Sequence, residues 1–163
     1  MRTDSVAIRI KGVSHQFGEE GDEHYVPALL DASLDVARGE LLCLIGPSGC
    51  GKSTLLNIVG GLLVPNRGTV EVGGTVIRGP LPKEIAFVFQ ENALFPWSTV
   101  IDNVKLGMLF QGVPKAEHEE RARASLEAVG LADFANHYPG QLSGGMRQRA
   151  ALARALSLDT GIL

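Results

Sequence analysis

Residues 46–53, with the sequence Gly-Pro-Ser-Gly-Cys-Gly-Lys-Ser, match the phosphate-binding pattern Gly-x-x-x-x-Gly-Lys-Ser/Thr at every required position. Successive backbone N–H groups of such a loop form a nest for anions, and the following helix adds the positive end of its dipole. Lys52 can reach the β and γ phosphates of a nucleotide, and Ser53 can offer its hydroxyl to Mg²⁺. The predicted nucleotide contacts of this segment are Gly46, Pro47, Ser48, Gly49, Cys50, Gly51, Lys52, Ser53 and Thr54.

The residues on either side of this loop fit the same interpretation. The apolar run 41–45 predicts a buried strand with Cys43 in its core, and residues 53–59 predict the start of a helix. The alternative is an ordinary glycine-rich turn between a strand and a helix. The complete motif in this setting favours a phosphate site over that turn.

Composition narrows the class of protein. A length of 163 residues suits one domain or most of one, and 45% hydrophobic with 20% charged residues is ordinary for a globular chain. The net charge of −3 argues against a nucleic-acid surface, which usually needs a basic field. We expect no transmembrane helix, no signal peptide in residues 1–5, and, with two cysteines, a reduced cytosolic setting rather than a disulfide framework.

Short alternating segments predict a small antiparallel β layer before and after the loop. Residues 6–10 and 34–36 alternate apolar and polar side chains, and the acidic stretch 19–24 reads as a surface loop. Residues 69–72 and 75–77 flank Gly73-Gly74, which is a two-residue hairpin signal. The apolar run 85–89 predicts a second buried strand that ends at Gln90.

From residue 98 onward the pattern becomes helical. Val100, Val104 and Met108 share one helical face, Pro114 can begin a second helix that ends near Gly130, and residues 131–137 predict a short third helix.

A second anion site is predicted where the next helix begins. In the run 141–149, Ser143 is a good N-cap for a helix that extends to about Leu156. The hydroxyl, the glycine N–H groups and the helix dipole meet at that point.

These motifs together resemble a known family. The loop 46–53, Gln90 after an apolar strand, and Leu-Ser-Gly-Gly-Met-Arg-Gln-Arg at 142–149 have the order and spacing of ATP-binding subunits of ABC transporters. The stretch 89–97, which ends in Leu-Phe-Pro-Trp, resembles the subunits that energise import of nitrate, aliphatic sulfonates and taurine.

The resemblance implies a fold, which we expect to be α/β: a P-loop NTPase core with an N-terminal antiparallel β layer and an inserted helical subdomain, incomplete at the C-terminus. Residues 1–163 would be the N-terminal part of an ABC nucleotide-binding domain. Within it, residues 1–97 form the β layer and P-loop core, 98–140 the helical subdomain, and 141–163 the signature motif with its helix.

The resemblance also implies site roles. Phe17 is similar to the aromatic residue that stacks on adenine, with Tyr25 as the competing candidate. Gln90 is similar to the residue that contacts Mg²⁺ and the attacking water, so Gln90 and Lys52 are the predicted catalytic residues, and Ser53 and Gln90 the predicted metal ligands. Ser143, Gly144 and Gly145 would bind the γ phosphate of ATP held by a second subunit.

The implied partners follow from the same resemblance. They are ATP with Mg²⁺, a second ATP-binding subunit in a homodimer, a membrane permease, and indirectly a periplasmic or extracellular solute-binding protein, with no nucleic acid. The resemblance also implies a location for the subunit, at the cytoplasmic face of the inner (plasma) membrane. The subunit would be a peripheral protein there, attached through the permease. Trp97 lies near where family members receive a coupling helix of the permease, or else it packs against the helical subdomain.

The sequence departs from the family at its end. In the family, the residues after position 163 complete a strand with a metal-linked Asp, followed by a catalytic Glu and later a switch His. We expect Asp159 to lie in the turn before that strand, the neighbouring strand edge to be unpaired, and hydrolysis to be impaired, since loss of a general base costs about 10²–10⁴-fold. A non-hydrolytic regulatory nucleotide-binding module and an ABC ATPase outside transport are the alternatives.

Overall fold

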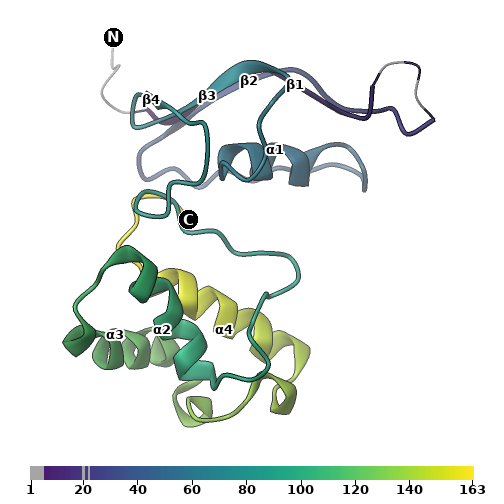
Figure 1. Ribbon diagram of the computed structural model, residues 1–163. Helices are drawn as coiled ribbons and strands as arrows, with labels where there is room; N and C mark the ends of the chain where they lie inside the picture. Colours follow the sequence, from purple (N-terminus) through teal and green to yellow (C-terminus); the bar gives the residue numbers. More distant parts are fainter. Residues whose placement is uncertain (1–5, 20, 22) are drawn as a thin grey trace. The chain divides into compact units, whose positions relative to one another are not determined.

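The chain folds into two compact units, Met1–Leu81 and Pro82–Leu163. Figure 1 shows the computed structural model, which describes residues 6–19, 21 and 23–163. The prediction for residues 1–5, and the part of the predicted surface loop at positions 20 and 22, lie outside the described residues.

The first unit contains the predicted antiparallel β layer. The strands among its described residues are β1 (Val6–Phe17), β2 (Val26–Ala37), β3 (Arg67–Val72) and β4 (Thr75–Val76), in the order β2-β1-β3-β4. Strands β1 and β2 are longer than the alternating segments predicted, because each continues along its partner through register shifts. The α/β class with an antiparallel β layer is confirmed.

One face of this sheet forms the core of the unit. Ile10, Val13 and Val70 are almost fully buried on it. Helix α1 (Lys52–Val59) lies alongside the sheet (Figure 1) and contacts β2. The helix buries the side chains of Leu55 and Ile58. Burial of one side of α1 explains why an eight-residue helix is stable here, since so short a helix is marginal alone.

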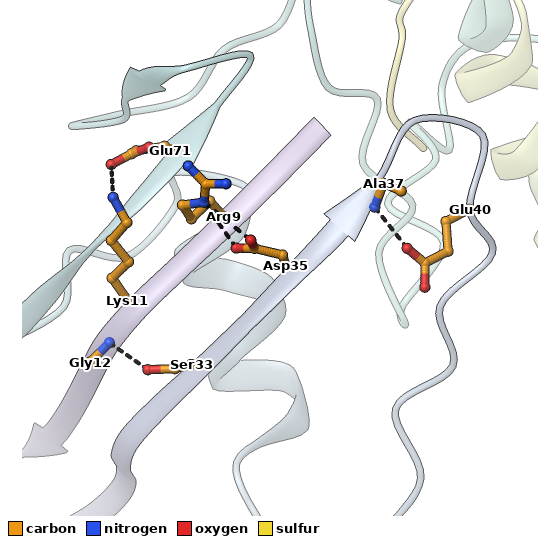
Figure 2. A network of polar contacts seen from close by, with 8 residues as sticks. All are labelled: Arg9, Lys11, Gly12, Ser33, Asp35, Ala37, Glu40 and Glu71. Atoms are coloured by element: carbon orange, nitrogen blue, oxygen red, sulfur yellow. Dashed lines mark hydrogen bonds and ion pairs between the residues drawn. The ribbon is translucent and has the colours of Figure 1, made fainter. Parts of the chain in front are cut away.

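The opposite face carries charged cross-strand pairs, which Figure 2 shows. Arg9 Nε lies 3.1 Å from Asp35 Oδ1 on the neighbouring strand, and Lys11 Nζ lies 2.8 Å from Glu71 Oε1 on the other side. The hydrogen bond to Asp35 raises the pKa of Arg9 above its ordinary value. Exposed pairs of this kind add little stability, but opposite charges face each other only in the observed register.

The hairpin predicted at Gly73-Gly74 is confirmed. Val72 pairs with Thr75, and the two glycines between them have φ angles of 55° and 84°. Two consecutive positive φ angles are what a two-residue type I′ hairpin requires, and glycine adopts them without steric cost.

The prediction of a buried strand at residues 41–45 is wrong. The segment forms no strand, and Leu41 and Ile45 are 90% and 94% exposed. Cys43, predicted in the core, is exposed as well. The physical reason is that no strand in the described part of the chain forms a hydrogen-bonded ladder with this segment, and apolar sequence alone does not satisfy backbone groups.

The second unit is helical. It contains α2 (Val100–Gln111), α3 (Lys115–Ala128), α4 (Gly144–Leu156) and two 3₁₀ turns, η2 (Ala132–Phe134) and η3 (Pro139–Gln141). The predicted face of Val100, Val104 and Met108 is confirmed, because all three side chains are fully buried. The core of this unit also includes Ile101, Ala122, Leu126, Leu131, Ala135, Leu142, Ala150 and Ala153.

Two predictions in this unit need correction. Residues 85–89 form no strand beyond a parallel bridge between Ile85 and Ile162, because a single bridge does not make a hydrogen-bonded ladder. Residues 131–137 form only the three-residue turn η2 rather than a helix, since the backbone N–H groups of Val100 and Ile101 take the carbonyls of His137 and Ala135.

We predict that Leu126→Ala destabilises the helical unit by about 2–5 kcal/mol, because Leu126 is fully buried and its removal leaves a cavity. The measurement is urea unfolding followed by helical circular dichroism. Leu109→Ala is the matched control, since Leu109 is 51% exposed and should change stability little. Equal losses for the two variants would contradict the observed core.

Candidate nucleotide-binding site

The glycine-rich loop leads directly into helix α1. Gly49 and Gly51 have φ angles of 81° and 92°, and Gly51 is the N-cap residue, with no side chain to cap the helix. The first N–H groups of a helix have no partner within the helix. At Lys52 and Ser53 these donors therefore point out of the helix start and can bind an anion.

The side chain of Lys52 is held back over the loop. Its Nζ donates to the carbonyl oxygens of Gly46 at 2.8 Å and Pro47 at 2.7 Å. The Sγ of Cys50 lies 3.5 Å from the same nitrogen and is a weak acceptor. An ammonium has three donors, so Lys52 can keep both carbonyl contacts while the third donor exchanges the thiol for a phosphate oxygen.

Gly51 is the point where the loop meets strand β2. A Cβ atom at Gly51 would lie 2.4 Å from the Ala28 carbonyl oxygen, well inside van der Waals contact. A Cβ at Gly49, in contrast, would meet nothing within 4 Å. The glycine at position 51 is thus required both by its φ angle and by the backbone beside it, whereas Gly49 is required by φ alone.

Both candidate aromatic residues lie at the end of the β1–β2 pair. Phe17, the last residue of β1, is 46% exposed, and its ring meets His15 edge-on with 4.8 Å between centroids. Tyr25 is half-buried, and its hydroxyl donates to Gln16 Oε1 at 3.5 Å. The freer ring face of Phe17 favours it as the adenine contact, which stays a prediction.

The start of helix α4 is the second predicted anion site. Ser143 is the N-cap, as predicted, and its Oγ accepts a hydrogen bond from the N–H of Met146 at 3.3 Å. Ser143, Gly144 and Gly145 are all exposed, and a Cβ at Gly145 would meet nothing within 4 Å. The N-terminus of α4 is therefore open to a ligand.

Gln90 is exposed in the loop that precedes α2. The loop continues to Trp97, which is 73% exposed and lies against the Phe95 ring with 5.2 Å between centroids. Of the two interpretations of Trp97, packing against the helical residues of this unit is disfavoured by that exposure.

Asn103 holds the backbone of this loop in place, and no sequence motif identified it. It is fully buried in α2, and its amide oxygen accepts from the N–H of Phe95 at 2.7 Å. Its Nδ2 donates to the carbonyls of Phe95, Ser98 and Thr99. A polar residue between the apolar positions Val100 and Val104 was the available signal, because buried amides need partners.

The predicted site residues therefore fall into two groups. Phe17 and the loop with Lys52 belong to the first unit, whereas Gln90 and the Ser143–Gly145 segment belong to the second. Ser53 and Gln90, the predicted Mg²⁺ ligands, are both exposed and stand in different units. No group of three His, Cys, Asp or Glu side chains suited to a metal occurs among the described residues.

A glycine loop at a helix N-terminus, next to an antiparallel β layer, defines a nucleotide-binding protein of the P-loop class. Residues 29–163 match the family described as ABC transporter. The chain is 40% identical to the ABC transporter ATP-binding protein YtrE of Bacillus subtilis, over 96% of this chain and 72% of that protein. The chain belongs to this family, and the resemblance inferred from its motifs is confirmed.

Two further relatives carry the same printed name, taurine import ATP-binding protein TauB. The protein from Chromobacterium violaceum is 49% identical over all of this chain, and that from Pseudomonas aeruginosa is 46% identical over 96% of it. The chain spans 58% of the length of each.

Solved structures agree with this assignment. The dimeric ATP-binding cassette MJ0796, bound to ADP and Pi in a post-hydrolysis state, superposes with a TM-score of 0.85 at 35% identity. The match covers 94% of this chain and 70% of that one. The expected fold class, an ABC ATPase cassette of the P-loop type, is thereby confirmed. Within the described residues, no helix has the length and apolar character needed to cross a membrane.

We predict that Gly51→Ala destabilises the first unit more than Gly49→Ala does. Both substitutions force a side chain into a left-handed backbone, at about 1–2 kcal/mol, but only Gly51→Ala also collides with the Ala28 carbonyl, which adds about 1–3 kcal/mol. Thermal and urea unfolding of both variants measure the difference. Equal losses would show that the contact with β2 is unimportant.

Proposed function

We propose that this chain is the ATP-binding part of a subunit of an ABC importer, which couples ATP binding and hydrolysis to uptake of a small anionic solute. The main support is the loop at residues 46–53, whose helix start and Lys52 ammonium suit a triphosphate. The names of the two taurine relatives support a solute of the taurine or sulfonate type, with nitrate as a related anion. The expectation of impaired hydrolysis stays a prediction.

The residues present fit ATP and Mg²⁺. Backbone N–H groups at residues 49–54 and the Lys52 ammonium supply donors for phosphate oxygens, and Phe17 offers a ring face for adenine. Ser53 and Gln90 carry oxygen atoms, and oxygen is the ligand atom that Mg²⁺ prefers. When bound, Mg²⁺ neutralises charge that develops during phosphoryl transfer.

In this proposal the residues of the chain act mainly by positioning and electrostatics. Lys52 binds the β and γ phosphates, and Gln90 orients the water that attacks the γ phosphate. Ser143, Gly144 and Gly145 bind the γ phosphate of ATP on a second copy of the chain. The exposed N-terminus of α4 and the dimeric form of the MJ0796 cassette support this arrangement.

The proposed partners beyond the second copy are a membrane permease and, through it, a solute-binding protein outside the cell. The exposed Trp97 and Phe95 support a permease contact, because Asn103 holds the loop that presents them. The subunit would then lie on the cytoplasmic face of the inner membrane.

We predict that Lys52→Ala weakens MgATP binding about 10–100-fold, because hydrogen bonds to charged groups contribute about 1.5–3 kcal/mol. Titration with a fluorescent ATP analogue, displaced by unlabelled ATP, measures the affinity. Lys115→Ala, an exposed lysine of the helical unit, is the control and should bind as the parent chain does. Absence of ATP binding to the parent chain would overturn the proposed function.

We predict that Phe17→Ala weakens ATP binding about 2–10-fold, since an aromatic stacking contact contributes about 0.5–1.5 kcal/mol. Binding of inorganic triphosphate, which has no base, should stay unchanged and serves as the internal control. Tyr25→Ala tests the competing residue. A larger loss for Tyr25→Ala than for Phe17→Ala would transfer the role of the adenine contact to Tyr25.

A further inference from the structure

The turn directly after Gln90 has an unusual backbone. Ala93 has a φ angle of 46°, and its N–H donates to the carbonyl of Glu91, only two residues earlier. A left-handed conformation costs a residue with a side chain about 1–2 kcal/mol. A strained conformation of this kind persists only where surrounding contacts impose it.

Arg154, near the end of helix α4, supplies that contact. Its Nη1 donates to the Ala93 carbonyl at 2.7 Å, and its Nη2 donates to the Asn92 carbonyl at 3.1 Å. The two bonds join residues more than sixty positions apart in the sequence. The planar guanidinium can hold two neighbouring oxygen atoms at once, which a lysine ammonium cannot do with the same geometry.

The surroundings of Arg154 indicate that this contact is specific. The side chain is half-buried, and burial lowers its pKa from the ordinary value. It still carries its charge at neutral pH. No carboxylate pairs with it among the residues that the structure describes, so the two carbonyls are its recorded partners.

Helix α4 connects this contact to the second anion site. Ser143, Gly144 and Gly145 lie at its N-terminus, and Arg154 lies in its last turn, roughly 15 Å along the axis at 1.5 Å per residue. Ala150 and Ala153 are fully buried between these ends, so the helix is anchored in the core of its unit. Movement of the turn after Gln90 is therefore resisted by the helix that Ser143 caps.

We infer that Arg154 is a positioning residue that fixes the turn after Gln90 to helix α4 and thereby links Gln90, at the water that attacks the γ phosphate, to the Ser143–Gly145 site. The inference rests on the proposed function, since it requires ATP at the loop. Arg154 touches neither nucleotide nor metal in this role and acts through the backbone of Asn92 and Ala93.

The experiment uses the full 163-residue chain and its single tryptophan, Trp97, which lies in the same loop as Gln90. Emission from Trp97 is recorded on addition of MgADP and of a non-hydrolysable MgATP analogue, and nucleotide affinity is measured separately by displacement of a fluorescent analogue. We expect the parent chain to give an emission change that depends on the γ phosphate.

Arg154→Ala should abolish most of this change while affinity stays within about threefold, because the residues of the phosphate loop belong to the other unit. Arg154→Lys should retain part of the change, since it keeps the charge and one hydrogen bond. Arg121→Ala is the matched control, an arginine whose recorded partner, Glu117, is on its own helix, and it should respond as the parent does.

A double-mutant cycle separates positioning from a merely structural role. If Arg154 acts through Gln90, adding Arg154→Lys to Gln90→Ala should have no further effect on the emission change. If Arg154→Ala fails to fold, the Arg154→Lys variant and this cycle still test whether Arg154 acts through Gln90.

A full γ-phosphate response in Arg154→Ala or in Arg154→Lys, or additive effects in the cycle, would overturn the inference and leave the proposed function intact. A parent chain that binds nucleotide but shows no change in Trp97 emission that depends on the γ phosphate would also overturn the inference and leave the proposed function intact. A parent chain that binds no nucleotide would overturn both.

Discussion

The close approach of Gly51 to the carbonyl of Ala28 is the contact on which the phosphate loop depends. It lets the loop pack directly against strand β2 at the residue that caps helix α1, which begins at Lys52. The direction of the first helical N–H groups follows from that start, and so does the position from which Lys52 reaches back to the loop carbonyls. A side chain at position 51 would separate the loop from the strand, so the anion site requires a glycine there for packing as well as for conformation.

The parts of the fold that could be predicted from the sequence are those set by neighbouring residues. The Gly73-Gly74 hairpin, the Ser143 cap and the buried face of Val100, Val104 and Met108 each depend on a few adjacent positions. The strands predicted at 41–45 and 85–89 were wrong, because a strand exists only where a second segment completes its hydrogen bonds. Apolar composition indicates that a segment is suited to burial. It does not identify the second segment that would pair with it and bury it.

The candidate site divides in the same way. The phosphate loop and the start of α4 could be predicted because consecutive residues supply both the donors and the geometry. Asn103 and Arg154 could not be identified by motif, because their partners are backbone carbonyls, in the adjoining loop for Asn103 and more than sixty positions away for Arg154. Every residue has a backbone carbonyl, so a contact of this type does not require a particular amino acid at the partner position. Only the removal of an amide or guanidinium from solvent on a helix indicates that such a partner must exist.

Helix α4 repeats this type of contact three times. Arg147 donates to the Leu142 carbonyl at 2.6 Å, Arg149 donates to the Val129 carbonyl at 2.9 Å, and Arg154 holds the carbonyls after Gln90. Each bond attaches a different segment to the same helix: its own N-terminal approach, the end of α3, and the loop before α2. Charge-assisted bonds to backbone are insensitive to the side chains of those segments. The helical unit can therefore vary the sequence of its loops and still keep their backbones fixed relative to the N-terminus of α4, which is what the proposed phosphate contact of Ser143, Gly144 and Gly145 would require.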